Sequence, residues 1–534
     1  MIVYGSGSSL LTNLAPGGGP SEDVWDAFDE AIDRSGASHV FGLGDHARPG
    51  NSWQWQACQK HLQRSTAAVH LIRGDLDRGP LPGYEAAGGG AANRMVDVGR
   101  NRFVLLDNRT MFSAEDLQFL GSACSEHESR ANTFVMTHSR LFELDDDKSN
   151  WNRDVVPILK EHGVRYVFCG ETNDAMLSTH VVPRRAEAPD LFYFCPGFHF
   201  SGYRGPGLYV ELRFDGDELT GILPRAIPLD VRHPWFKFHP GWDNGATRAA
   251  PGDWLPEPEV SGPAAGKVVW SLPDEKQEGI TRMALWGHAY SMHIDNHDDG
   301  RIETEELISA FVDELNRLEF DHVFALGDHV FEPSSADEWA IVKKHFTRIH
   351  AQLHMIRGNH ERIEKLPVLE ELAGDVRNNQ VVIGRNRFVL FGYREVYSPD
   401  DLAYLDRAFT PSADVANTFF LTHLMSYRYR PVSECPPGVD PNKPYGGYSN
   451  WNTDVLPLLD GRVKYVFFGD IYKRLAGHCV APNGTYYITT GFMFRGERPL
   501  AYLDLHFRGD ELIRAIPRTV PIDLRNGWYY YEKP

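Results

Sequence analysis

The sequence contains little cysteine, and its few cysteines form no framework. Only six of the 534 residues are cysteine, and they show no close spacing that would indicate a metal site or a set of disulfides. Two of them, Cys169 and Cys195, lie in apolar, strand-like runs. We therefore expect buried free thiols and a reducing, cytoplasmic environment.

Long apolar segments are also missing. No run is long enough to cross a bilayer. Met1 leads directly into the apolar stretch Ile2–Tyr4, without the charged and apolar regions of a secretory signal. The sequence thus predicts a protein of the cytoplasm that has no membrane partner.

An excess of positive charge is absent as well. Lys and Arg total 54 residues against 73 Asp and Glu, which gives a formal net charge of −19 at pH 7. Nucleic acids and anionic membranes both require a cationic surface on their protein partners. The charge therefore argues against either as the main partner, while a local basic pocket stays compatible with it.

What the sequence does contain is nearly the same series of motifs twice. HVFGLGDH from His39 is answered by HVFALGDH from His322, and HLIRGDLDRG from His70 by HMIRGNHERI from His354. Four further pairs follow in the same order: GRNRFVLL and GRNRFVLF, NTFVMTH and NTFFLTH, SNWNRDVVPIL and SNWNTDVLPLL, RYVFCGE and KYVFFGD. The period is far longer than that of solenoid repeats, so we predict a tandem duplication of a whole domain.

The length agrees with two domains, because 534 residues exceed what one apolar core usually supports. The matched motifs place the first domain at 1–239 and the second at 279–534. Residues 240–278 are dense in Pro, Gly and Ala and lack apolar periodicity, which predicts a linker or wrapping segment.

Each half alternates apolar runs with helical stretches. In the second half the predicted strands are Met283–Trp286, His322–Leu326, Leu353–Ile356, Arg387–Phe391, Thr418–Thr422, Tyr465–Phe468, Tyr486–Thr490 and Ala501–Phe507. The predicted helices are Glu305–Leu318, Glu338–His350 and Val455–Leu459. This alternation predicts a layered α/β fold, and the polar motif residues fall at the carboxyl ends of strands, where such sheets place their sites.

These strand-end motifs resemble the calcineurin-like metallophosphoesterase family, whose series is D-x-H, GD, GNH with Asp or Glu, a lone His, and GHxH. The string IRGNHE in the second half is the most specific match, and the resemblance covers each half almost end to end. It implies two tandem four-layer αββα sandwich domains, a two-metal site and hydrolysis of phosphate esters.

In the second half the resemblance implies that Asp328, Asn359 and His423 bind metal and that His360 is the proton donor. The chemistry agrees, since Asp, Asn and His suit divalent metals such as Mn, Fe or Zn. A histidine near the reacting group can protonate the leaving oxygen.

Two motifs of the second half depart from the family. The first reads WGHAYSMH, so His288 and Tyr290 stand where Asp and His are expected. The last reads GDIY, which puts Asp470 and Tyr472 at the positions of two histidines. One metal thus keeps a plausible ligand set, with Asp470 added, whereas the other retains only His288.

The first half departs further. Asp45, Asp75, His138 and Glu171 stand at ligand positions, but Leu76 replaces the proton-donating histidine. The remaining motif positions are also changed: Ser6, Ser8 and Asn173. We interpret this set as a vestigial metal site without catalysis, because the acid is missing.

Two features belong to the second half alone. Asp295, Asp299 and Glu306 fall at calcium-ligand positions of an EF-hand-like loop, DNHDDGRIETEE. The same acids also fit an ordinary acidic helix start, or ligands that partly replace the degenerate first motif. Arg428 and Arg430, in the long loop after His423, fit either a phosphate-binding role or a solvated loop.

Two functions follow from these residues. The first is a phosphoesterase that hydrolyses a phosphorylated small molecule in the second half by metal-activated water, since metals offset the charge that makes phosphate esters resistant. The alternative is an inactive scaffold that binds a ligand, a metal or a partner, because both halves have lost D-x-H and GHxH. Metal analysis of the purified protein separates the two.

Overall fold

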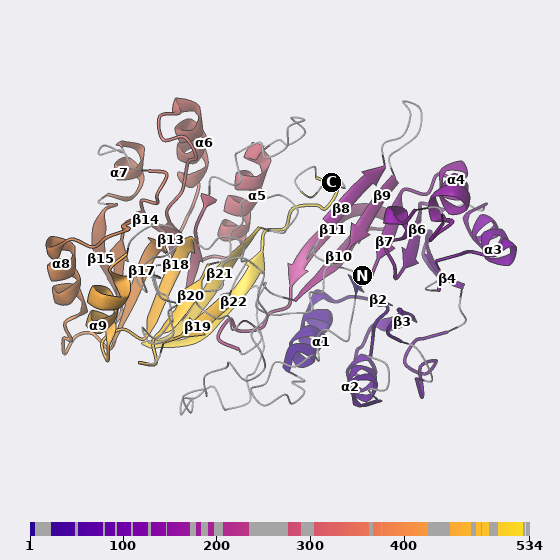
Figure 1. Cartoon of the computed structure of the whole chain (residues 1–534), viewed down its shortest axis with the longest axis horizontal. Helices are drawn as coiled ribbons and strands as arrows, with labels where there is room; N and C mark the ends of the chain where they lie inside the picture. The colour runs from indigo at the N-terminus through magenta and orange to yellow at the C-terminus, as the bar shows by residue number, and fades with distance from the viewer. Residues whose placement is uncertain are drawn as a thin grey trace, which may run out of the picture.

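The computed structural model describes residues 1–5, 23–47, 52–77, 81–90, 93–107, 110–125, 130–145, 147–170, 178–182, 191–196, 207–233, 236, 276–289, 304–361, 367–374, 376–424, 449–470, 477–481, 483–490, 500–526 and 529. These residues form two halves that lie side by side, indigo to magenta and orange to yellow in Figure 1. Each half combines two sheets with flanking helices, so the predicted α/β class is confirmed.

The first half contains a five-stranded and a six-stranded sheet. The five-stranded order is β11-β10-β1-β2-β3, formed by β1 (Ile2–Tyr4), β2 (His39–Leu43), β3 (Ala68–Ile72), β10 (Leu208–Asp215) and β11 (Glu218–Ala226). The six-stranded order is β4-β5-β6-β7-β9-β8, formed by β4 (Arg94–Val98), β5 (Asn101–Leu105), β6 (Asn132–Thr137), β7 (Tyr166–Cys169), β8 (Ser178–Val182) and β9 (Leu191–Cys195). Its α-helices are α1 (Asp23–Ser35), α2 (Ser52–Leu62), α3 (Ala114–Ser125) and α4 (Val156–Glu161).

The second half repeats this topology. Its five-stranded order is β22-β21-β12-β13-β14, formed by β12 (Ile280–Trp286), β13 (His322–Leu326), β14 (Gln352–Ile356), β21 (Ala501–Arg508) and β22 (Glu511–Thr519). Its six-stranded order is β15-β16-β17-β18-β20-β19, formed by β15 (Asn378–Ile383), β16 (Asn386–Phe391), β17 (Asn417–Leu424), β18 (Tyr465–Asp470), β19 (Gly477–Val480) and β20 (Tyr486–Thr489). Its α-helices are α5 (Thr304–Arg317), α6 (Ala336–Phe346), α7 (Pro367–Ala373), α8 (Pro399–Phe409) and α9 (Leu456–Leu459).

Apolar side chains fill the space between the two sheets of each half. In the first half Phe41 of β2 stacks on Phe103 of β5, with ring centroids 4.6 Å apart. In the second half Phe324 of β13 and Phe388 of β16 meet in the same way at 5.2 Å. Alternate residues of each strand point to this layer, which is why one face of each sheet reads as apolar.

The opposite face of each five-stranded sheet is covered by helices. Phe28 of α1 packs on Tyr4 of β1 at 5.3 Å, and Phe311 of α5 packs on Trp286 of β12 at 4.9 Å. The helices α3 and α4, and α8 and α9, contribute to the apolar clusters on the outer faces of the six-stranded sheets. Each half is therefore a four-layer sandwich of helix, sheet, sheet and helix.

The predicted strands of the second half are confirmed, with one or more residues added at several ends. The helix expected at Glu338–His350 instead spans α6, Ala336–Phe346, because Ser335 caps it and residues 347–351 turn into β14. Residues Trp451–Val455 form a π-helical turn before α9, as Trp151–Val155 do before α4.

The shared SNWN motif is a structural turn in both halves. The side chain of Asn450 accepts a hydrogen bond from the N–H of Tyr397 at 2.8 Å and donates to its carbonyl at 2.9 Å. Asn150 makes the same two bonds with Phe112. The motif thus fixes the segment after β5 or β16 to the π-helical turn.

The two halves meet at their last strands and exchange the segments that follow them, near the centre of Figure 1. After β11 the N–H of Val231 donates to the carbonyl of Ala515 in β22 at 2.7 Å. After β22 the N–H of Leu524 donates to the carbonyl of Ile222 in β11 at 2.8 Å. The contacts are equivalent, since 524 − 231 and 515 − 222 both equal 293.

Carboxylates repeat this exchange. Asp230 accepts a hydrogen bond from the N–H of Ala515 at 3.0 Å, and Asp523 accepts one from the N–H of Ile222 at 3.2 Å. Each aspartate also forms an ion pair with the arginine two residues later at 2.7 Å. The interface is therefore approximately twofold symmetric, as in an isologous dimer.

The described cysteines agree with the prediction of buried free thiols. Five cysteines, Cys58, Cys124, Cys169, Cys195 and Cys479, are buried and free. Among the described helices, none is long and apolar enough to span a bilayer.

Candidate metal centre

Polar side chains of the second half gather where strands of both sheets end. His288 follows β12, Asp328 follows β13, Asn359 follows β14, His423 lies near the end of β17, and Asp470 ends β18. All five had been predicted from the sequence as metal ligands. The structure brings them together.

Glycines allow these strand ends to approach. A side chain at Gly287 would collide with the carbonyl oxygen of Gly469, where β12 meets β18 across the two sheets. A side chain at Gly358 would collide with the carboxylate of Asp328. The glycines of the GD, GN and GH motifs are thus required by close backbone contact.

Asp328 has a strained backbone that is held by a buried carboxylate. Its φ is 55°, a left-handed conformation that is uncommon for residues other than glycine. The side chain of Glu361 accepts four backbone N–H groups: Asp328 at 2.9 Å, His329 at 2.5 Å, Val330 at 3.1 Å and Gly358 at 2.6 Å. The Glu of GNHE therefore joins the loops after β13 and β14 and fixes Asp328 toward the cluster.

His423 is oriented by a carbonyl group. Its Nδ1 lies 2.6 Å from the oxygen of Leu326, and a carbonyl only accepts, so Nδ1 carries a proton. Its Nε2 faces Oδ1 of Asn359 at 2.8 Å and Oδ1 of Asp328 at 3.3 Å. This nitrogen needs a positive charge beside it, either its own proton or a cation.

His288 completes the cluster. Its Nε2 lies 2.8 Å from Oδ1 of Asp470, and its Nδ1 lies 3.2 Å from Oδ2 of Asp328. Ligand atoms of His288, His423 and Asp470 all lie within 4.8 Å of one another. His288 and His423 are buried, and Asp328 is completely so.

These contacts shift the pKa values of the cluster. Burial alone would raise the pKa of Asp328, but His423 and His288 hold it well below its usual range. Burial would lower the pKa of His423, whereas Asp328 raises it to about 9. For Asp470, burial is also outweighed by His288 and His423, which lower its pKa.

The donor set fits a divalent cation. Carboxylate oxygens, an amide oxygen and imidazole nitrogens converge, and these are the ligands of Mn, Fe and Zn in proteins. Oδ2 of Asp328 is buried and accepts no hydrogen bond from any described residue, which leaves a lone pair directed into the cluster. A cation would supply the missing partner.

His360 lies at the rim of this cluster. Its N–H donates to Oδ1 of Asp328 at 3.0 Å, and its Nδ1 lies 2.8 Å from the carbonyl oxygen of Phe331. The carbonyl fixes one proton on Nδ1, so a second ring proton, when present, is carried by Nε2.

The first half has the same scaffold with fewer ligands. Asp45 also has a φ of 55°, and Nδ1 of His138 lies 2.6 Å from the carbonyl oxygen of Leu43. Nε2 of His138 lies 3.1 Å from Asp75 and 3.4 Å from Asp45. Burial raises the pKa of Asp45 to about 6 despite His138, and the hydrogen bond from His138 lowers the pKa of Asp75. The three predicted residues form a metal-sized cluster.

Several predicted residues lie outside the described part of the chain. These are Glu171, Asp295, Asp299, Arg428, Arg430 and the motif positions Ser6, Ser8, Asn173, Tyr290 and Tyr472. Glu306 is described and is an exposed residue of the first turn of α5. The calcium-loop and arginine-loop interpretations stay predictions.

Three site residues were not predicted from the sequence. Glu361 and its counterpart Asp77 hold the loops, and their place after GNH and GDL was the available signal. Arg357 is half-buried near Arg394, and its guanidinium makes no hydrogen bond or ion pair with any described residue. Its signal was its position directly before GNHE.

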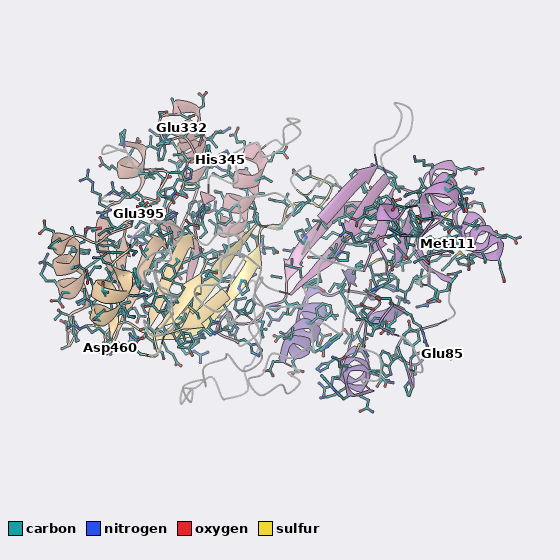
Figure 2. All side chains as sticks on the ribbon, in the orientation of Figure 1. Glu85, Met111, Glu332, His345, Glu395 and Asp460 are labelled. Carbon is teal, nitrogen blue, oxygen red and sulfur yellow. The ribbon has the colours of Figure 1, made fainter. Side chains whose placement is uncertain are left out.

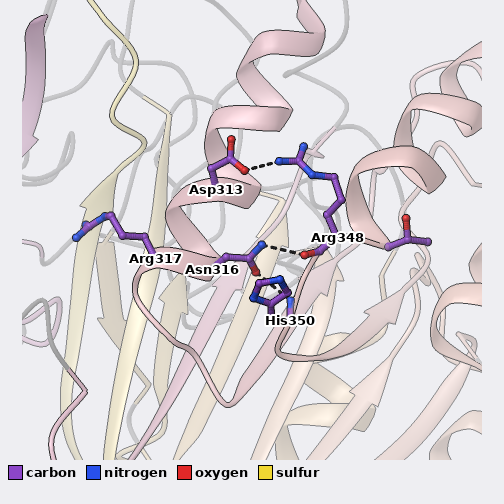
Figure 3. A pocket seen from close by; sticks show the side chains of 6 residues that line it. Asp313, Asn316, Arg317, Arg348 and His350 are labelled. Carbon is purple, nitrogen blue, oxygen red and sulfur yellow. Dashed lines mark hydrogen bonds and ion pairs between the residues drawn. The ribbon is translucent and has the colours of Figure 1, made fainter. Parts of the chain in front are cut away.

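A cavity of about 540 Å³ lies elsewhere in the second half. It is lined by Asp313, Asn316, Arg317, Thr347, Arg348 and His350, which come from α5 and the turn before β14 (Figure 3). Asn359 follows the other end of β14, so cavity and cluster lie at opposite ends of this strand. Arg348 pairs with Asp313, and Asn316 donates to the carbonyl of Arg348, so the polar groups here bind one another.

Known proteins resemble the chain in fold only. No family model matches the sequence, and no curated protein matches it. A dimetal phosphatase from Danio rerio matches with a TM-score of 0.33 and 15% identity over 45% of this chain and 99% of its own. A purple acid phosphatase from yellow lupin seeds matches with a TM-score of 0.32 and 11% identity. The match covers 45% of this chain and 51% of the phosphatase chain. TT1561 of Thermus thermophilus matches with a TM-score of 0.29 and 13% identity over 46% of this chain and all of its own.

Proposed function

We propose that the second half is a metal-dependent phosphoesterase. The observation that carries the proposal is a convergence at the strand ends of both sheets, with His360 at the rim: Asp328, Asn359, His423, His288 and Asp470. A divalent cation bound there would offset the charge of a phosphate group and acidify a water molecule. The motif series also supports kinship with calcineurin-like metallophosphoesterases and an origin by tandem duplication.

Three residues around the cation would serve the other needs of the reaction, which are proton donation, phosphate binding and positioning of the ligands. Nδ1 of His360 is held by the carbonyl of Phe331, so Nε2 is the nitrogen that can donate a proton to the leaving oxygen. The guanidinium of Arg357, which pairs with no residue of the described part of the chain, offers positive charge to the phosphate. Glu361 keeps Asp328 and Asn359 in one geometry, which limits the reorganisation needed when substrate binds.

The first half lacks the proton donor, since Leu76 stands at the position of His360. Its cluster of Asp45, Asp75 and His138 supports a structural metal site rather than a catalytic one. The free and buried thiols support an intracellular setting for the whole chain.

The test is hydrolysis of para-nitrophenyl phosphate with added Mn²⁺. Asp328→Ala and His360→Ala should each lower kcat/KM at least about 100-fold, because one removes a metal ligand and the other the general acid. The matched first-half variants Asp45→Ala and Leu76→Ala should change it less than about twofold. Activity that responds equally to both members of either pair would refute the assignment to the second half.

One observation favours a second function, a metal-binding scaffold without turnover. His288 and Asp470 lie 2.8 Å apart, and Tyr290 and Tyr472 stand at two further ligand positions of the motif series. Elemental analysis separates the two functions. Stoichiometric metal with no hydrolysis under any added divalent cation would select the scaffold.

A further inference from the structure

Phe331 is an exposed aromatic residue that lies beside His360 at the rim of the second-half metal cluster. Its side chain is 48% exposed. Its N–H donates to the carboxylate of Glu338 at 2.7 Å, and its carbonyl accepts from Nδ1 of His360 at 2.8 Å. Both backbone groups of Phe331 are therefore hydrogen-bonded, which fixes the point from which its ring extends.

The ring of Phe331 lies directly against the proton donor. Its centroid is 4.9 Å from that of His360, and the two planes are tilted by 34°. On the other histidine, the ring of Tyr393 lies 6.0 Å from that of His423 in an edge-on arrangement. Aromatic side chains thus lie beside His360 and His423 of the second-half site.

The first half has polar residues at the equivalent positions. Phe331 follows GDHV as Arg48 follows GDHA, and Tyr393 follows FVLFG as Asn108 follows FVLLD. The aromatic pair therefore occurs in the half that carries His360 and not in the half that carries Leu76. This association links the aromatic surface to the step in which His360 takes part.

The position of the proton donor determines what touches Phe331. A leaving oxygen that receives a proton from Nε2 of His360 must lie within hydrogen-bond distance of that nitrogen. The carbon group on this oxygen then extends past the imidazole ring, where the exposed face of Phe331 is the adjacent apolar surface. A planar ring attached to the oxygen can stack there, whereas a small alkyl group covers little of it.

The charges near Phe331 further restrict which leaving groups can bind beside it. Glu332 is the next residue and is exposed, and Glu338 holds the N–H of Phe331 (Figure 2). Two carboxylates disfavour a leaving group that carries negative charge of its own. The surface therefore fits a neutral aromatic alcohol better than a nucleotide or an acidic peptide.

We propose that Phe331 is a positioning residue that selects phosphate esters with a neutral, planar aromatic leaving group. The proposal rests on the proposed function of the same site. Stacking on Phe331 aligns the leaving oxygen with His360, so the residue acts on substrate selection and on kcat rather than on metal binding.

The experiment compares 1-naphthyl phosphate with ethyl phosphate on the full-length, Mn²⁺-loaded protein. Phe331→Ala should lower kcat/KM for 1-naphthyl phosphate about fivefold more than for ethyl phosphate, the factor expected for one lost aromatic contact. Phe331→Tyr, which keeps the ring, should restore the ratio. Met111→Ala is the matched control, because Met111 is 52% exposed on the other half (Figure 2) and should not change the ratio.

A binding measurement separates this proposal from the proposed function. Isothermal titration with 1-naphthylphosphonate and ethylphosphonate needs no turnover, and the wild-type protein should prefer the naphthyl compound about fivefold. If no ester is hydrolysed but Phe331→Ala removes this preference, the aromatic surface stands and the phosphoesterase assignment falls. If hydrolysis proceeds and Phe331→Ala affects both esters equally, the selection by Phe331 is refuted.

Discussion

The two halves share the same backbone arrangement at the cluster, but the pKa of the central aspartate is shifted in opposite directions. Both have an aspartate at φ 55° and a histidine anchored by a carbonyl at 2.6 Å. In the first half burial raises the pKa of Asp45 to about 6, whereas in the second His423 and His288 hold the pKa of Asp328 well below its usual range. Two differences contribute: His288 lowers the pKa of Asp328, whereas the carboxylates of Asp75 and Asp77 raise that of Asp45.

The comparison separates what maintains the fold from what maintains the chemistry. Glycines, strained aspartates and anchored histidines recur in both halves, because the packing of two sheets requires them. The residue at the end of the first strand and the residue after GN or GD differ, because only the proposed metal binding and proton transfer would depend on them. The first half therefore keeps the backbone arrangement without the full set of residues for the proposed reaction.

The strongest test of this comparison gives the second half the residue of the first. His288→Ser should weaken Mn²⁺ binding at least about 100-fold, since even the loss of an outer partner of a ligand reaches that range. Isothermal titration of the metal-depleted protein measures the change. His288→Asp is the control and should keep the affinity, because a carboxylate can bind the cation in place of imidazole. Unchanged affinity in His288→Ser would remove His288 from the ligand set.

Glu361 and Asp77, the two carboxylates that join the site loops, should contribute to the free energy of unfolding in proportion to the hydrogen bonds that they accept. Glu361 accepts four backbone N–H groups, whereas Asp77 accepts those of Ala47 and Gly74. We expect Glu361→Ala to lower the free energy of unfolding by about 4 kcal/mol and Asp77→Ala by about 2 kcal/mol, since each leaves buried donors unsatisfied. Urea unfolding measures both.

The control for this unfolding experiment is Glu370→Ala in α7. Glu370 is exposed, so its replacement should change the free energy of unfolding by less than about 0.5 kcal/mol. Equal losses from Glu361→Ala and Asp77→Ala would show that the number of accepted N–H groups does not determine the stability of these loops.

The smallest expected effect is a difference in pH dependence between the halves of the metal-free protein. The folded state holds a proton on Asp45 up to about pH 6, above its usual 3.8, so the first half loses stability as pH rises through that window. His423 keeps its proton to about pH 9 against the usual 6.5, so the second half loses stability between these values.

Hydrogen exchange of strand amides, corrected for intrinsic rates, tests this prediction. Between pH 6.5 and 9, protection of β13 and β17 should fall on the order of tenfold while that of β2 and β6 stays constant. Parallel behaviour of the two halves would mean that the cluster charges do not govern local stability.

The sequence predicted the α/β class, the main strands and the members of the cluster. This succeeded because strand-end motifs such as GDH and GNHE depend on local spacing and on alternation along buried strands. Asp328, Asn359 and His423 were identified because their motifs resemble the family's series in order and spacing.

Other features could not be read from local pattern. Arg357 matters because no described residue pairs with it, and Phe331 because it is exposed, and both are properties of tertiary surroundings. The end of α6 at Phe346 depends on the turn into β14, which periodicity does not encode. The exchange of segments between the halves involves residues about 290 apart and leaves no local signal.

That exchange has a consequence for how the molecule comes apart. Asp230 and Val231 cover the edge of β22, and Asp523 and Leu524 cover the edge of β11. Separation of the halves would uncover both edges at once, and bare edges invite pairing with other chains. The interface between the two halves of this one chain is therefore built like the interface of a dimer. Cutting the peptide between the halves should yield a tight noncovalent pair instead of two independent proteins.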